Sequence, residues 1–102
     1  MNSPITMKVS TPVLLFFGLA SAWELDIWST NNEHLAMHGT VNSGCVNLGV
    51  GALKINHARF SESSFADTFE LYENRNCDVK KYSNGDGDWT FNTKTVRSYK
   101  VY

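Results

Sequence analysis

Apolar and polar residues alternate in short stretches along the chain from residue 23 onward. A period of two marks strands with one buried face, and no stretch keeps the 3.6-residue period of a helix. Eight strands are predicted, at residues 23–28, 35–41, 46–50, 54–60, 68–72, 79–82, 89–92 and 96–102. Gly, Asn, Ser and Asp separate them, which is typical of an antiparallel β-sandwich or barrel. We therefore expect an all-β fold.

The alternating pattern occurs twice. Leu25-Asp26-Ile27-Trp28 and Phe69-Glu70-Leu71-Tyr72 both read apolar, acidic, apolar, aromatic, and an Asn-rich turn follows each. A period of about 40 residues indicates a duplicated unit that cannot bury its apolar face alone. Two four-stranded motifs, 23–60 and 68–102, can bury these faces against each other. The polar segment 61–67 joins them and has room for one helical turn.

The first 22 residues have the pattern of a secretory signal peptide. Lys8 supplies positive charge, residues 13–19 are apolar, and Ala20-Ser21-Ala22 has the small residues of a cleavage site. The apolar run is well short of the roughly 20 residues that a membrane span needs. An uncleaved anchor is the alternative. We expect a domain at 23–102 that is secreted, extracellular and without a membrane span.

The charge balance argues against a nucleic-acid partner. The chain has 9 Lys and Arg against 10 Asp and Glu, a net charge of −1. Removing Lys8 with the signal leaves 8 against 10, a net charge of −2. Nucleic-acid-binding domains usually carry a basic stripe instead. We expect a monomer that binds no nucleic acid.

The chain has two cysteines, Cys45 and Cys77. In a secreted chain an even number normally means disulfides, and two cysteines allow one pairing. Two free buried thiols are the alternative. We expect the disulfide, and closing a loop of this length stabilises a fold by roughly 3–4 kcal/mol.

Candidate catalytic and metal-binding residues are sparse. His34 and His38 follow Glu33 with the i, i+4 spacing that would join two zinc ligands on a helix. On a strand the same spacing separates them by about 13 Å. His57 has no neighbouring ligand, and we interpret it as a structural or surface histidine. No Gly-x-Ser-x-Gly nucleophile motif occurs. We expect a protein that is not an enzyme and holds no metal or cofactor.

Two segments of the second motif resemble βγ-crystallins. Residues 71–77 (LYENRNC) are similar to the folded-hairpin signature of that family, and residues 96–101 look like its last strand, with Ser98 at the usual serine. The chain departs from the signature at Cys77, where a second aromatic residue is usual, and at Val79, where glycine is usual. In the first motif Glu33 stands at the aromatic position.

The resemblance implies a single βγ-crystallin-like sandwich of two Greek-key motifs. In that family the third strand of each motif crosses into the sheet of the other, which would bring Cys45 and Cys77 into one sheet. It also implies a structural role for Trp28 and Tyr72, each packing under the folded hairpin of its motif.

Many microbial βγ-crystallins bind calcium through an Asn/Asp-rich motif ending in serine. The matching positions here are 52–57 and 93–98, and neither contains an acidic ligand. Lys94 and Arg97 add positive charge to the second. Since Ca²⁺ needs several oxygen ligands, we expect no specific calcium site.

The overall appearance resembles small secreted fungal proteins of this fold, including killer-toxin-like and effector-like members. The resemblance implies a non-enzymatic protein that recognises a target outside the producing cell, such as a cell-wall glycan or a protein. A cell-wall or spore-coat structural protein is one alternative. A carbohydrate-binding module is another, and two or more exposed coplanar rings would favour it. Its candidate stacking residues are Trp23, Trp28, Tyr72, Tyr82 and Trp89.

Overall fold

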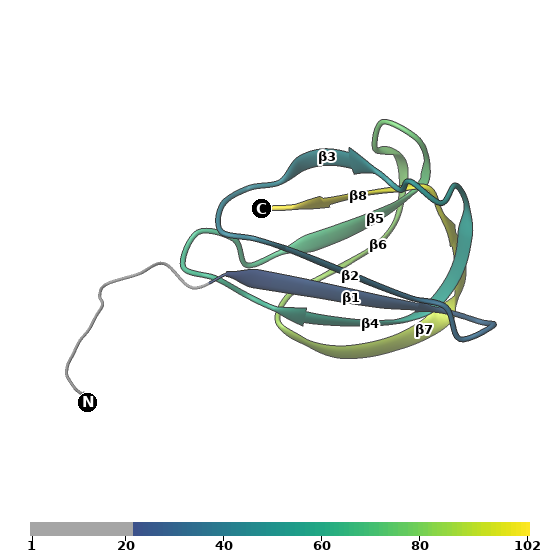
Figure 1. Ribbon diagram of the computed structural model, residues 1–102, viewed down its shortest axis with the longest axis horizontal. Helices are drawn as coiled ribbons and strands as arrows, with labels where there is room; N and C mark the ends of the chain where they lie inside the picture. The colour runs from purple at the N-terminus through teal and green to yellow at the C-terminus, as the bar shows by residue number, and fades with distance from the viewer. Residues whose placement is uncertain (1–21) are drawn as a thin grey trace, which may run out of the picture.

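The computed structural model describes residues 22–102, so the predicted signal peptide lies outside the described residues except for Ala22. Two four-stranded antiparallel sheets face each other (Figure 1). The strands are β1 (Trp23–Ser29), β2 (His34–Gly39), β3 (Gly44–Asn47), β4 (Leu53–Ser61), β5 (Phe69–Asn74), β6 (Asp78–Asn84), β7 (Gly87–Val96) and β8 (Ser98–Val101). Sheet A has the order β2-β1-β4-β7, and sheet B has the order β3-β8-β5-β6. The predicted all-β class is confirmed.

Each half of the chain gives its third strand to the sheet of the other half. β3 pairs with β8 from Gly44–Val101 to Asn47–Ser98. In the same way β7 of the second half pairs with β4 of the first. The two halves are therefore interlocked by backbone hydrogen bonds, and neither sheet is made by one half alone.

The core follows the alternation of the sequence. On β1 the side chains of Leu25 and Ile27 are fully buried between the sheets, and on β5 those of Phe69 and Leu71 are also fully buried. Phe60 packs against Phe69 with 5.3 Å between ring centroids. The remaining core residues are Trp23, Leu48, Ile55, Ala58, Ala66, Val96, Tyr99 and Val101.

Several strand ends differ from the predicted ones. β3 ends at Asn47 instead of residue 50, because residues 48–51 form a turn in which Gly51 N donates to Leu48 O at 3.4 Å and Gly51 has a φ of +84°. Leu48 nevertheless stays buried, whereas Val50 is 62% exposed. β7 is longer than predicted, since it pairs with most of β4. In the predicted linker 61–67, Ser61 ends β4, and residues 63–66 form a tight turn closed by an isolated bridge between Ser63 and Ala66 in place of a helical turn.

The disulfide between Cys45 and Cys77 is present, as predicted. Cys45 lies on β3, and Cys77 lies in the turn between β5 and β6. Both elements belong to sheet B, so the bond fastens a strand of the first half to a turn of the second. Asn47 and Asn76 add two hydrogen bonds to the same junction, of 2.7 and 3.2 Å.

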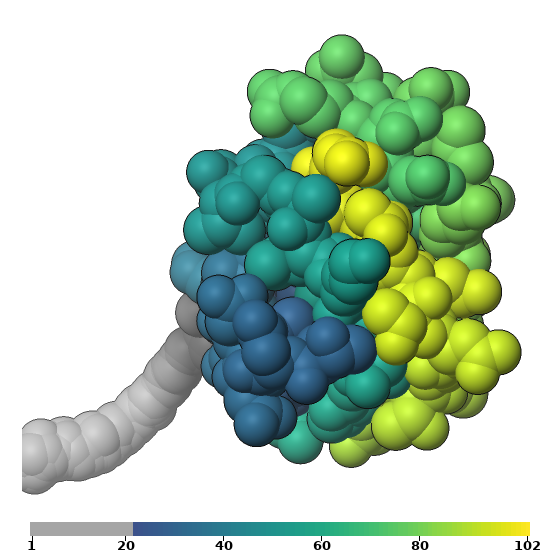
Figure 2. Space-filling view, turned by 90° about the vertical axis from the view of Figure 1, so that its right-hand side faces the viewer, coloured from purple at the N-terminus to yellow at the C-terminus, as the bar shows by residue number. Residues whose placement is uncertain are grey.

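The turns after β1, β3, β5 and β7 gather at one end of the molecule, which faces the viewer in Figure 2. The turns after β1 and β5 correspond in the repeat, and both contain an asparagine in the left-handed region. Asn32 has a φ of 68° and Asn76 a φ of 63°. Asparagine tolerates this conformation better than most residues, which explains the repeated Asn-rich turns.

Candidate binding surface

The outer face of sheet A carries the polar positions of the alternating strands. Because Leu25 and Ile27 point into the core, Asp26 and Trp28 point outward from β1. Register then places side chains of the neighbouring strands beside them. Trp28 lies opposite His34 on β2 and His57 on β4, and Asp26 lies opposite Arg59 on β4.

Trp28 is held between two imidazole rings. The ring of His34 stacks on it with 4.6 Å between centroids and an interplanar angle of 7°. The ring of His57 stacks at 4.3 Å and 16°. The guanidinium carbon of Arg59 lies 5.3 Å from the indole centroid, within the range of a cation–π contact. Both faces of the indole are therefore covered by side chains of the protein itself.

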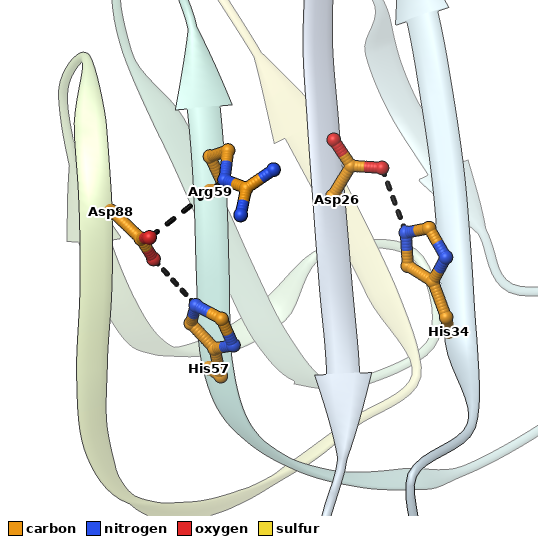
Figure 3. A network of polar contacts seen from close by, with 5 residues as sticks. All are labelled: Asp26, His34, His57, Arg59 and Asp88. Atoms are coloured by element: carbon orange, nitrogen blue, oxygen red, sulfur yellow. Dashed lines mark hydrogen bonds and ion pairs between the residues drawn. The ribbon is translucent and has the colours of Figure 1, made fainter.

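Two carboxylates orient the two histidines, and Figure 3 shows them projecting from the same face of sheet A. His34 Nε2 lies 2.8 Å from Asp26 Oδ1, and His57 Nε2 lies 2.5 Å from Asp88 Oδ1. Asp88 also faces Arg59, with 3.7 Å from Oδ2 to Nε. We call these residues the Trp28 face: Asp26, Trp28, His34, His57, Arg59 and Asp88.

The Trp28 face is partly open to solvent. The side chains of Arg59 and Asp88 are 55% and 56% exposed, that of His34 is 44% exposed, and those of Asp26 and His57 are half-buried. The face is thus a preformed array of a tryptophan, two imidazoles, an arginine and two carboxylates that solvent and a partner can reach.

The outer face of sheet B has an acid and an aromatic residue at the equivalent positions, Glu70 and Tyr72. Here both are buried, at 4% and 7% exposure. The Glu70 carboxylate accepts hydrogen bonds from the Tyr72 hydroxyl, from the Tyr102 hydroxyl at 2.6 Å and from Lys80 Nζ at 3.1 Å. This copy of the pair is satisfied within the protein.

The pKa values of this pair follow from its enclosure. Burial raises the pKa of Glu70, but the hydrogen bonds from Tyr102, Tyr72 and Lys80 and the charge of Lys80 outweigh it, so that the pKa lies below its ordinary value. Burial and the hydrogen bond to Glu70 raise the pKa of Tyr72 to about 12. The folded state therefore favours an ionised carboxylate beside a protonated phenol.

The rest of the sheet B face is occupied by hydrogen bonds within the second half and by the disulfide. Ser98 lies opposite Tyr72, as His57 lies opposite Trp28. Its hydroxyl donates to Asn74 O at 2.6 Å and accepts from Cys77 N at 2.9 Å. Cys45 occupies the place in sheet B that Asp88 has in sheet A, and it forms the disulfide. Ser98 and Tyr72 are thus buried where His57 and Trp28 are partly open, whereas Cys45 is exposed like Asp88 but is held in the disulfide.

The aromatic residues proposed for sugar stacking do not lie on one surface. Trp23 is buried and donates its Nε1–H to Val41 O at 2.8 Å. Trp89 donates to Gly85 O at 2.9 Å. Tyr82 stacks on Phe91 with 4.0 Å between centroids, and both pack against the core. Trp28 is half-buried on the outer face of sheet A, and Tyr72 is buried on that of sheet B.

The histidines weighed as metal ligands lie on β2. Both His34 and His38 are exposed on that strand. Across residues 22–102, no cluster of three or more His, Cys, Asp and Glu side chains could hold a metal ion. The same residues contain no helix long and apolar enough to cross a membrane.

Sequence reasoning missed Arg59, Asp88 and the partnership of Asp26 with His34. The sequence did contain one signal for this surface. With Leu25 and Ile27 in the core, the period of two puts Trp28 on the outer face. The partners of Trp28 across the sheet could not be predicted from the sequence, because β4 has an irregular register between Ile55 and His57.

Comparison of the chain with protein-family models, curated proteins and solved structures found no match. Its function has to be inferred from this geometry.

Proposed function

We propose that this protein is a secreted, non-enzymatic recognition protein that binds a target outside the producing cell through the Trp28 face. In this proposal the sandwich is of the βγ-crystallin-like Greek-key type, and the protein acts as a toxin-like or effector-like factor. The exchange of third strands between the sheets supports the Greek-key interpretation. The disulfide is consistent with an oxidising, extracellular compartment.

One observation carries the choice of surface. The duplicated acid–aromatic pair is enclosed in sheet B, where Glu70 and Tyr72 are less than 10% exposed. In sheet A the corresponding pair, Asp26 and Trp28, is surrounded by charged groups that remain accessible. Packing explains the pair in sheet B. It does not explain the cluster in sheet A, where Arg59 and Asp88 are more than half exposed.

The composition of the Trp28 face suits recognition of a protein target. Arginine, with tryptophan and tyrosine, is enriched among residues that dominate binding energy at interfaces, and Arg59 is the exposed member of this class on the Trp28 face. The two His–Asp pairs hold the indole in one orientation, so little side-chain freedom remains to be lost on binding. A carbohydrate platform would instead need an open ring face, and both faces of the Trp28 indole are covered. We therefore place a protein target ahead of a glycan.

The test is binding of fluorescently labelled protein to fungal, bacterial and plant cells. Arg59→Glu reverses a charge at the centre of the Trp28 face, and Lys81→Glu makes the same change on β6, in sheet B. Both residues are exposed, and each reversal puts a like charge beside one carboxylate, so the two variants carry a matched repulsion that solvent screens and neither change should unfold the domain. On the cell type that is bound, Arg59→Glu should weaken binding at least about tenfold, or 1.4 kcal/mol, and Lys81→Glu should not. Equal binding by the two variants would refute the choice of surface.

A further inference from the structure

The two sheets end in four edge strands, and three of them are protected against pairing with another chain. Exposed edges are commonly blocked by lysines, by short length or by irregular backbone. β6 carries adjacent Lys80 and Lys81 and has a left-handed residue, Val79, near its start. β3 has only four residues and is fastened by the disulfide. β7 carries Lys94 and has an irregular register with β4.

The fourth edge, β2, has none of these devices. Its sequence, His-Leu-Ala-Met-His-Gly, contains no Lys, Arg or Pro, and it pairs with β1 in one regular run of six residue pairs. The hydrogen bond from Ser29 N to Glu33 O sets the alternation of bonded and non-bonded pairs. It follows that the backbone N–H and C=O groups of His34, Ala36 and His38 point away from β1, toward the free edge.

Two hollows flank this edge. One, of ≈ 310 Å³, is lined by Leu35, Val50 and Leu53 together with Glu33 and His34. The other, of ≈ 170 Å³, is lined by Glu24, Asp26, Ala36, Met37 and His38. A strand laid along β2 would direct alternate side chains to opposite faces of the sheet, one set toward each hollow.

The charges around the edge select the kind of segment that fits. Three carboxylates line the two hollows, those of Glu24, Asp26 and Glu33, and no lysine or arginine lines either of them. The larger hollow also presents apolar side chains from Leu35, Leu53 and the 62%-exposed Val50. A complementary segment therefore alternates basic and apolar residues.

We propose that β2 is the docking edge for an extended segment of a protein partner, in which basic residues alternate with apolar ones and which adds to sheet A as a fifth strand. Main-chain hydrogen bonds would supply affinity, and the two hollows would supply side-chain selectivity. The proposal rests on the proposed function in one respect: His34 belongs to both β2 and the Trp28 face, so the added strand would extend the same surface.

The probe for this proposal is the capped hexapeptide Lys-Val-Lys-Val-Lys-Val, with Glu-Val-Glu-Val-Glu-Val as its charge-reversed counterpart. The first should bind the wild-type domain in the micromolar-to-millimolar range by NMR titration, and the second at least about tenfold more weakly. The amide protons of Ala36 and His38 should become protected from exchange when the basic peptide is bound. Absence of binding at about 5 mM, or equal binding of both peptides, would overturn the proposal.

Ala36→Pro is the matched variant. It removes a donor that points to the free edge and leaves the β1–β2 hydrogen bonds intact, and proline is tolerated at such edge positions. Ala36→Val keeps the donor and adds similar bulk. Peptide affinity should fall at least about tenfold in the proline variant and less than about threefold in the valine variant, with unchanged circular dichroism. Strand addition would be refuted if the two variants bound the basic peptide with equal affinity. It would also be refuted if Ala36→Pro bound the peptide as tightly as wild type does.

Two further measurements separate this proposal from its rivals. Sedimentation would show whether the wild type dimerises. A wild-type dimer that is absent in Ala36→Pro would mean that two copies of the chain pair through β2, against the proposal. If only Arg59→Glu loses binding to cells, the Trp28 face is the contact surface and the docking edge is refuted. A loss in Ala36→Pro alone would support the edge and refute the face.

Discussion

Among residues 22–102, Val79 is the residue whose backbone conformation is least suited to its side chain. Its φ is 63°, in the left-handed region, and a β-branched residue is rare there. In the proposed resemblance to βγ-crystallins, it stands where the hairpin signature has glycine. The side chain is 46% exposed, so it contributes little to the core that would explain its presence. Replacing it measures the strain directly.

The informative comparison is between Val79→Gly and Val79→Ala. Both variants remove the isopropyl group, so the loss of its partial burial is nearly the same in each. A left-handed conformation costs an L-residue roughly 1–2 kcal/mol, and glycine avoids this cost. Glycine loses about 0.5–1 kcal/mol more than alanine in backbone entropy. We expect Val79→Gly to be more stable than Val79→Ala by about 0.5–1 kcal/mol, or several degrees in Tm.

Urea and thermal unfolding of the oxidised domain would measure this difference. Lys81 on the same strand is the control, because it is exposed and has no left-handed backbone. There the order should reverse, with Lys81→Ala more stable than Lys81→Gly by about 0.5–1 kcal/mol. If alanine is as stable as glycine at residue 79, the left-handed conformation is wrong, and with it the geometry of the turn between β5 and β6.

Two more predictions concern packing and pH. A Cβ atom on Gly39 would lie 2.8 Å from Cζ2 of the buried Trp23, so Gly39→Ala should cost about 1–3 kcal/mol in thermal unfolding. Since the pKa of Glu70 is lowered in the folded state, its contribution to stability is present above its ordinary value of 4.5 and lost as the pH falls through the folded value. The stability advantage of wild type over Glu70→Gln should therefore shrink as the pH is lowered below 4.5, and a constant difference would contradict this. The raised pKa of Tyr72 adds stability that is lost as the pH rises from 10 through about 12.

Much of the fold could be predicted from the sequence, because its signals are local. The period of two marks the strands, and all eight predicted strands overlap observed ones. The count of two cysteines leaves a single pairing, and the structure contains it. Asn-rich turns mark the first connection of each half, because asparagine accepts the left-handed backbone found at Asn32 and Asn76.

The candidate site could not be predicted in the same way, because it depends on register across strands that are distant in sequence. His57 and Asp88 are 31 residues apart and meet only because β4 and β7 pair. The irregular register near Asn56 shifts the alternation of β4 and decides which face His57 occupies. A shift of one residue would have sent His57 into the core and Ala58 outward.

The two copies of the acid–aromatic pair differ in their neighbours and in their exposure. In sheet B the neighbours of the pair are Ser98 and the hydroxyl of Tyr102, which enclose it, and the disulfide, which fastens the two halves together. In sheet A the equivalent neighbours are His57 and Asp88, which hold the indole and remain accessible. A domain of this size buries a limited fraction of its surface, so its free energy of unfolding is small. An exposed, charged cluster adds little to that free energy. The enclosed copy and the disulfide supply part of that stability. Under the proposed function, stability and recognition lie on opposite faces of the sandwich, and substitutions on the outer face of sheet A should change binding with smaller effects on folding than those at Glu70 or Tyr72.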